Sequence, residues 1–221
     1  MSALYVFAFT DRAARPLRHG ARRIEFIDVA GIHAAVEHVS ARPSVSEAAL
    51  RAQHTIVMQI AASVEAILPA RFGALLDREE LEALVAMRRE SIVQALQLVS
   101  GRTQMTVRVF TSAGAPGSPH AAGVDEQGTA LSGSAYLEQR RRRAAVPPLS
   151  ALARSLSGAV RHLVHAERTE RGHGRVDWTL YHLIDRSVVR QYEKALDRLR
   201  SSSVVVTGPW PPFAFVPDLW A

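Results

Sequence analysis

The 221-residue sequence contains no cysteine. This absence excludes disulfide bonds, catalysis by a thiol and metal sites built on thiolates. No apolar run reaches the ~20 residues that a helix needs to cross a bilayer, so we expect no membrane segment. We also expect no secretory signal peptide, because Asp11, Arg12 and Arg15 interrupt the apolar start MSALYVFAFT. These absences favour a cytoplasmic location.

Signatures of enzymes and cofactor sites are missing as well. The sequence has no G-x-S-x-G motif, no Walker-type phosphate loop and no G-x-G-x-x-G after a strand. His162 and His165 are spaced to reach one metal ion, and His173 and His182 follow in the sequence. However, the H-E-x-x-H pattern is absent, and the edge of an amphipathic helix is the better interpretation of His162 and His165. We therefore expect no catalysis, no cofactor and no metal ion.

The formal net charge of +6 is concentrated in one segment. Residues 138–175 hold nine arginines and three glutamates, whereas the rest of the chain has 18 basic and 18 acidic residues. Four of these arginines are consecutive: Arg140, Arg141, Arg142 and Arg143. Consecutive helical residues point to all sides, which favours a solvated helix end. Alternatively, the segment docks an acidic patch of a partner, or phosphate.

A nucleic-acid-binding sheet is the obvious rival interpretation of a basic α+β protein. Such sheets carry aromatic side chains in an RNP-type sequence. The strand TQMTVRVF lacks that glycine–aromatic pattern, so we expect no nucleic acid as a partner.

Apolar periodicity predicts strands and helices in a globular chain with 48% hydrophobic and 22% charged residues. Strands are expected at Leu4–Phe9, in a hairpin that turns at Ala30–Gly31, and at 70–76, 103–110, 174–185 and 203–208. Helices are expected from Ser46 to about Leu68, Asp77 to Val99, 133–145, Pro147 to Leu163 and Ser187 to Arg200. Ser46 and the pair Asp77 and Glu80 are typical helix N-terminal caps.

These elements predict an α+β protein of two domains, 1–100 and 101–208, each with helices on one face of a largely antiparallel sheet. The second domain is expected to be an α/β sandwich-like unit with an incomplete ferredoxin-like order, in which one strand is missing. Residues 112–133, with five glycines and two prolines, are expected to form a flexible loop.

Residues 209–221 form a tail that is unusually rich in proline and aromatic residues. Its central residues are Trp210, Pro211, Pro212, Phe213 and Phe215. We favour a tail that packs back over a groove between the two halves, because exposed aromatics beside valines would promote aggregation. The alternative is a peptide offered to a partner. Trp220 lies beyond this stretch and is the better candidate for an outward contact.

Several blocks resemble one known family, the gas vesicle proteins F and L. GPWPPFAFV closely resembles the family's C-terminal signature GPWPPYSFV, with Phe213 in place of the usual tyrosine. Other blocks follow in the family's order: ILPARFGALL, GRTQMTVRVF, GSAYLEQRR and LYHLIDRSVVRQYEKALDRL. The resemblance covers the chain from Leu4 to Val216. His182 departs from it, since the family has an apolar or small residue there.

The resemblance implies a non-enzymatic accessory protein of gas vesicles, the hollow protein shells of some microbial cells. Such a protein would bind the hydrophobic main shell protein and other accessory proteins during nucleation or early assembly, limit their aggregation and remain associated with the vesicle. It also implies a modified ferredoxin-like domain over residues 1–100. Candidate partner-binding residues are Arg71, the four consecutive arginines and Trp220. The alternative is a ferredoxin-like ligand- or RNA-binding regulator.

Overall fold

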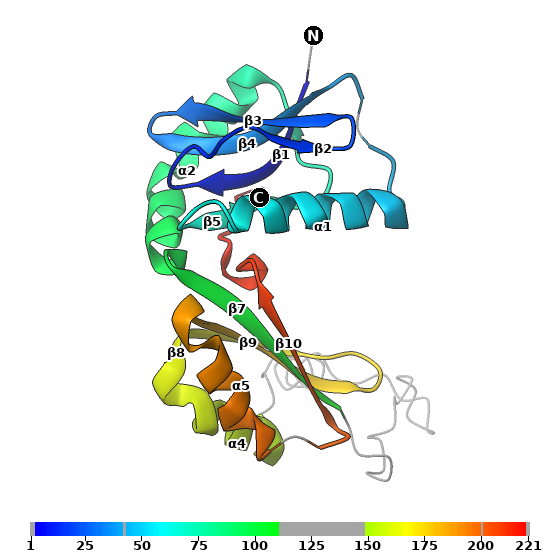
Figure 1. The fold of residues 1–221 in the computed structure, drawn as a ribbon, viewed down its shortest axis with the longest axis vertical. Helices are drawn as coiled ribbons and strands as arrows, with labels where there is room; N and C mark the ends of the chain where they lie inside the picture. Colours follow the sequence, from blue (N-terminus) through cyan, green and yellow to red (C-terminus); the bar gives the residue numbers. More distant parts are fainter. Residues whose placement is uncertain (1–2, 42, 111–148, 200, 220–221) are drawn as a thin grey trace, which may run out of the picture.

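The computed structural model describes residues 3–41, 43–110, 149–199 and 201–219 of the chain. Two sheet units lie one above the other along the long axis of the molecule (Figure 1). The upper unit has a six-stranded sheet and the lower unit a four-stranded sheet. Helices accompany both sheets, so the predicted α+β class is confirmed. In the described part of the chain, no helix is long and apolar enough to span a bilayer.

The upper sheet has the strand order β2-β3-β4-β1-β5, and β6 also pairs with β1. Its strands are β1 (Ala3–Thr10), β2 (Leu17–His19), β3 (Arg22–Val29), β4 (Ile32–Val39), β5 (Ile67–Pro69) and β6 (Leu75–Leu76). All pairings are antiparallel. The β3–β4 hairpin turns at Ala30 and Gly31 as predicted, and both residues adopt the positive φ that tight hairpin turns need.

Two helices, α1 (Glu47–Ala61) and α2 (Arg78–Val99), cover opposite faces of the upper sheet. Ser46 caps α1 and a capping box starts α2, both as the sequence predicts. From β1, Tyr5 and Phe7 belong to the buried cluster of α1, whereas Leu4 and Val6 belong to that of α2. The expectation of helices on one face is wrong for this unit, because β1 is apolar on both sides and each side needs cover.

The first long helix ends earlier than its apolar stripe predicts. It stops at Ala61 instead of Leu68, and Ile67 pairs with Thr10 in the sheet. A short run of apolar residues fits the apolar face of a helix and a buried strand equally well. Here the run forms a strand, because β1 offers an edge with which it can pair. The strand expected at 70–76 is also wrong, because Gly73 adopts φ +81° in a turn and only β6 remains extended.

The lower sheet has the strand order β10-β7-β9-β8, again entirely antiparallel. Its elements are β7 (Arg102–Phe110), α4 (Ala151–Val160), β8 (Val164–Arg171), β9 (Val176–Asp185), α5 (Val189–Asp197) and β10 (Val204–Trp210). Short 3-10 segments complete it: η1 (Arg161–Leu163), η2 (Arg186–Val188) and η3 (Phe213–Phe215). Trp178, Leu180 and Ile184 of β9 pack with α4 and α5 in one core, on the shared face that the alternation predicts.

The strand absent from the predicted order is β8, which lies at the edge of the lower sheet. Its sequence VHAERTER is largely polar and exposed, so it carries no apolar alternation that would reveal it. His165 lies on this strand, so its predicted place on a helix is wrong, whereas His162 lies in the 3-10 segment η1 that follows α4.

Both lower helices are shorter than predicted. Ser150 caps α4, which therefore starts after the expected Pro147, and α5 covers only nine residues. The loop at 112–133 and the helix at 133–145 lie outside the described residues.

Candidate functional site

The two units are joined where α2 ends and β7 begins. Gly101 turns the chain there with φ +69°, and its N–H donates to the carbonyl oxygen of Glu65 at 3.0 Å. The Arg186 guanidinium reaches across from the lower unit and donates to the carbonyl oxygens of Val64 and Glu65, both at 3.1 Å. A charged donor that binds two carbonyls is a strong contact, so this corner ties the units together.

The C-terminal tail leaves the lower sheet at Trp210. Gly208 permits this with φ +127°, a backbone conformation that side chains rarely adopt. A Cβ there would lie 2.8 Å from the carbonyl oxygen of Gln104, so β10 approaches β7 closely at this point. The Thr103 hydroxyl donates to the Trp210 carbonyl at 2.9 Å and holds the departing chain.

Beyond Trp210 the tail runs between the two units. Phe215 and Leu219 are each 3% exposed and share a buried cluster with residues of both units, among them Leu68 and Leu183. Phe213 points outward and is 42% exposed. The tail residues therefore differ sharply in burial, although they are close in sequence.

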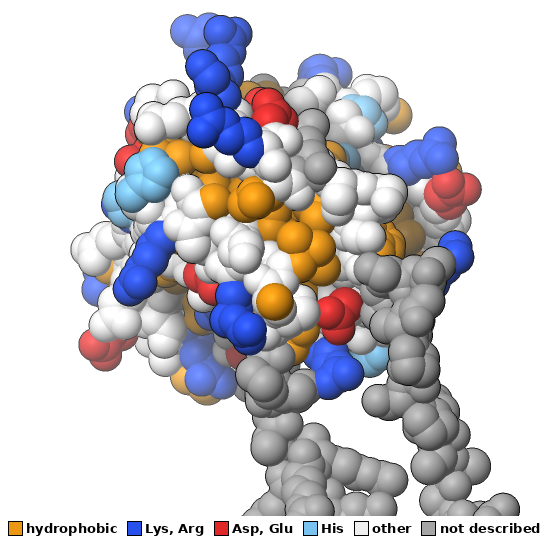
Figure 2. All heavy atoms as spheres, turned by 90° about the horizontal axis from the view of Figure 1, so that it is seen from below, with side chains coloured by type: hydrophobic (Ala, Val, Ile, Leu, Met, Phe, Trp, Pro, Cys, Tyr) orange, Lys and Arg blue, Asp and Glu red, His pale blue; other side chains and the backbone are white. Residues whose placement is uncertain are grey.

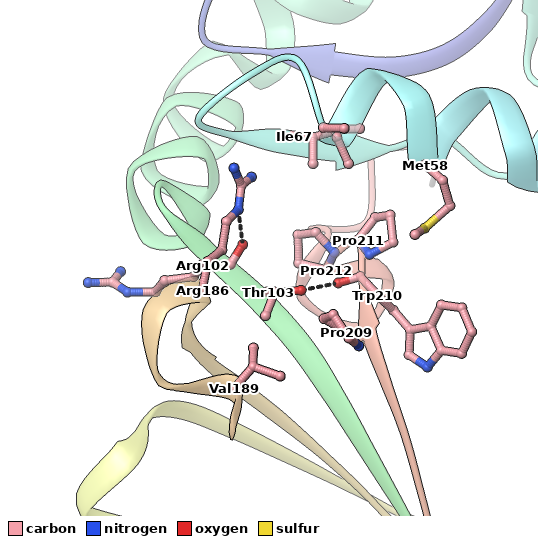
Figure 3. Close-up of a pocket in the computed structure, with 12 residues that line it drawn as sticks. Met58, Ile67, Arg102, Thr103, Arg186, Val189, Pro209, Trp210, Pro211 and Pro212 are labelled. Carbon is pink, nitrogen blue, oxygen red and sulfur yellow. Dashed lines mark hydrogen bonds between the residues drawn. The ribbon is translucent and has the colours of Figure 1, made fainter. Parts of the chain in front are cut away.

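A pocket of about 260 Å³ lies at this junction (Figure 3). Met58 and Ile67 line it from the upper unit, Val189 from the lower unit, and the prolines of the tail close it. The Trp210 ring stands at the pocket beside the His54 ring, with the centroids 5.5 Å apart in an edge-to-face arrangement. The lining is mainly apolar, as expected for a site that receives an apolar side chain.

The charged groups of the pocket already have partners. Besides its contacts with the upper unit, Arg186 donates through Nε to the Arg102 carbonyl at 3.4 Å (Figure 3). Arg102 donates to the Leu98 carbonyl, and its Nε lies 3.4 Å from a carboxylate oxygen of Asp185. Among the described lining residues these two arginines are the only titratable ones. The described lining thus holds no carboxylate or imidazole, and its one hydroxyl, that of Thr103, is bound to the Trp210 carbonyl.

A second polar feature, which the sequence analysis missed, is buried in the lower unit. His182 is completely buried, and its two ring nitrogens lie 2.5 Å from the Tyr192 hydroxyl and 3.0 Å from the Glu167 carboxylate. The Ser157 hydroxyl donates to the same carboxylate oxygen. Because a carboxylate only accepts, Nε2 of His182 carries the proton and Nδ1 accepts from Tyr192.

These surroundings shift the pKa values of Glu167 and Tyr192. The hydrogen bond to His182 lowers the pKa of Glu167, an effect that burial opposes and the Ser157 hydroxyl supports. Burial raises the pKa of Tyr192. The Ser157 hydroxyl binds the carboxylate and not the imidazole, whereas the imidazole takes the serine proton in a hydrolase triad. The Tyr192 hydroxyl does bind the imidazole, but Tyr192 and His182 are both fully buried, so the network satisfies buried polar groups.

The predicted site residues fall in different places. Trp210, Pro211 and Pro212 line the junction pocket. Arg71 lies on the exposed turn between β5 and β6 and is not part of the lining. Arg140, Arg141, Arg142, Arg143 and Trp220 lie outside the described residues. No sequence pattern predicted that Met58, Ile67 and Val189 would line a site, although Ile67 and Val189 lie in blocks that resemble the family.

Fold and site define a class: an α+β protein of two sheet units with a tail packed between them and an apolar pocket at their junction. A model of the family described as gas vesicle synthesis protein GvpL/GvpF matches residues 3–217. The chain therefore belongs to the GvpL/GvpF family of gas vesicle synthesis proteins. No curated protein sequence matches it significantly.

Two crystal structures share the fold. Gas vesicle protein GvpF from Anabaena sp. PCC7120 superposes with a TM-score of 0.71 at 14% identity, over 98% of this chain and 99% of that one. GvpF from Microcystis aeruginosa superposes with a TM-score of 0.68 at 12% identity, over 98% of this chain and 100% of that one. The similarity extends over both sheet units and shows a common architecture.

Proposed function

We propose that this protein is a non-enzymatic accessory factor of gas vesicle assembly, associated with the vesicle inside the cell. It binds the hydrophobic main shell protein and other accessory proteins during nucleation or early assembly. The observation that carries this proposal is the match to the gas vesicle synthesis family over residues 3–217. A subunit whose final surface faces gas exposes apolar area before it polymerises, and such surfaces aggregate. A partner that covers these apolar surfaces reduces the amount of shell protein that aggregates.

The junction pocket is the proposed contact with the shell protein. Its lining is apolar, and its two guanidinium groups are bound to neighbouring backbone, so an apolar group enters without stripping water from a free charge. Phe213, 42% exposed on the same tail, extends the apolar surface. The binding is expected to be transient, near micromolar strength or roughly 8 kcal/mol, so that the growing shell can remove the subunit.

Co-expression with labelled main shell protein tests the proposal. We expect this chain to retain shell protein and keep it soluble at both low and high salt, because an apolar contact is not screened. Retention that is lost at high salt would instead place the contact on the basic segment 138–175. If no shell protein is retained at either salt, direct binding is refuted.

A matched pair of variants tests the pocket itself. Met58→Glu places a carboxylate in the apolar lining, whereas Met87→Glu makes the same change on α2 at a side chain that is 77% exposed. We expect Met58→Glu to reduce retained shell protein about tenfold and Met87→Glu to leave it unchanged. Circular dichroism of both variants checks that they fold. Equal retention by the two variants would exclude the pocket as the contact.

A further inference from the structure

A separate groove of about 510 Å³ runs between α4 and the edge strand β8. Arg154, Ser157 and Arg161 line it from the helix side, and Val164 and Glu167 line it from the strand. It shares no lining residue with the junction pocket. Both α4 and β8 belong to the lower unit, where β8 is the edge strand of the four-stranded sheet (Figure 1).

The charge that this groove presents to solvent is positive. Within the described part of the chain, the Arg161 guanidinium makes no hydrogen bond or ion pair, and Arg154 donates only to the Leu149 carbonyl. The acids of β8 are engaged inside the unit. Glu167 binds His182, and Glu170 accepts from the Tyr181 hydroxyl at 2.9 Å.

Basic side chains are also common in this part of the molecule. Figure 2 views it from the end where α4 and α5 lie, and basic side chains, with some acidic ones among them, lie around a central apolar strip. The described part of the basic segment, residues 149–175, supplies α4 and β8 and holds five arginines against two glutamates. A partner that fits this surface carries carboxylates.

The free edge of β8 indicates the conformation of the partner. Within the described residues β8 pairs only with β9, so the backbone N–H and C=O groups that point to its outer side are unpaired there. An extended peptide can add to such an edge through main-chain hydrogen bonds, while pockets beside the strand select its side chains. The groove under α4 is such a pocket, placed along this edge.

We propose that the groove between α4 and β8 binds an extended acidic segment of a partner protein. The segment adds to the free edge of β8 and places carboxylates against Arg154 and Arg161. A nucleic acid fits less well, because the described lining holds no phenylalanine, tyrosine or tryptophan ring on which a base could stack, and a sugar–phosphate backbone lacks the N–H groups that pair with a strand edge. This inference concerns a surface apart from the shell-protein contact and does not depend on it.

Peptide binding to the full chain tests the proposal. The probe is a fluorescent ten-residue peptide that alternates glutamate and valine, and fluorescence anisotropy measures its affinity. We expect Arg154→Glu combined with Arg161→Glu to weaken binding by at least about tenfold. Arg190→Glu combined with Arg198→Glu changes the net charge equally at an exposed position of α5 and at its exposed C-cap, outside the lining, and should change affinity less than about twofold.

Two further probes separate the groove from simple charge attraction. The same peptide N-methylated at alternate residues keeps its carboxylates but loses half of its N–H donors, and we expect at least about fivefold weaker binding. A ten-nucleotide single-stranded DNA should bind more weakly than the peptide at about 0.15 M salt. Equal affinity in both double variants, equal affinity of the N-methylated peptide, tighter binding of the DNA, or no peptide binding to the unmodified protein would each overturn the proposal.

Discussion

Replacing Phe215 by alanine tests whether the tail stabilises the junction of the two units. Phe215 is 3% exposed within a cluster that includes Leu68 of the upper unit and Leu183 of the lower unit. Truncating a buried phenylalanine removes its transfer free energy and leaves a cavity, which costs about 3–5 kcal/mol. The Arg168 guanidinium lies 5.8 Å from the centroid of the Phe215 ring. Losing this cation–π contact adds roughly 0.5 kcal/mol to the cost of the substitution.

Phe213 provides a matched control two residues away. It is 42% exposed, so its truncation loses only part of the burial free energy and opens no closed cavity. We expect the free energy of unfolding to fall by about 1–2 kcal/mol for Phe213→Ala. The structure therefore predicts that Phe215→Ala lowers the free energy of unfolding by at least about 1.5 kcal/mol more than the same change at Phe213.

Guanidinium unfolding followed by far-ultraviolet circular dichroism measures both variants. The difference in free energy comes from the shift of the transition midpoint at a common slope, and a changed slope would reveal separate unfolding of the two units. If the two variants lose the same free energy to within about 0.5 kcal/mol, the tail contributes no burial at the junction and the reasoning is refuted.

Three further changes probe the lower unit and the tail. Tyr192→Phe removes the donor to Nδ1 of buried His182, and we expect chemical denaturation to show a loss of about 1–3 kcal/mol. The lowered pKa of Glu167 means that its contribution is present above its usual pKa and is lost as the pH falls through the lower folded value. Glu167→Gln should therefore show a flatter decline of melting temperature below about pH 4.5 than the unmodified protein, and an unchanged slope would contradict this. Gly208→Ala should cost about 1–3 kcal/mol more than Gly174→Ala in thermal melts, because only the former brings a Cβ within 2.8 Å of a backbone oxygen.

Local patterns in the sequence determined many elements of this protein. The caps at Ser46 and Asp77 start α1 and α2, and the turn at Ala30 and Gly31 closes the β3–β4 hairpin. The alternation of β9 placed His182 on the same face as the apolar core. These features follow from interactions within a few residues, so the sequence is sufficient to predict them. The family blocks indicated the gas vesicle relationship, which the family match confirms.

Other features depended on partners that are distant in the sequence. β8 is polar and exists as a strand because β9 supplies its hydrogen bonds. Ile67 continues the apolar periodicity of α1, yet it belongs to the upper sheet because it pairs with the edge of β1.

Only the tertiary structure brings His182 together with Glu167, fifteen residues before it, and Tyr192, ten residues after it. It also assembles the junction pocket from α1, β5, β7, the start of α5 and the tail. The sequence by itself determined local conformation and family, since both reside in contiguous residues. The pocket, the buried polar network and the free edge of β8 arise from packing between segments far apart in the chain, and no local pattern encodes such contacts.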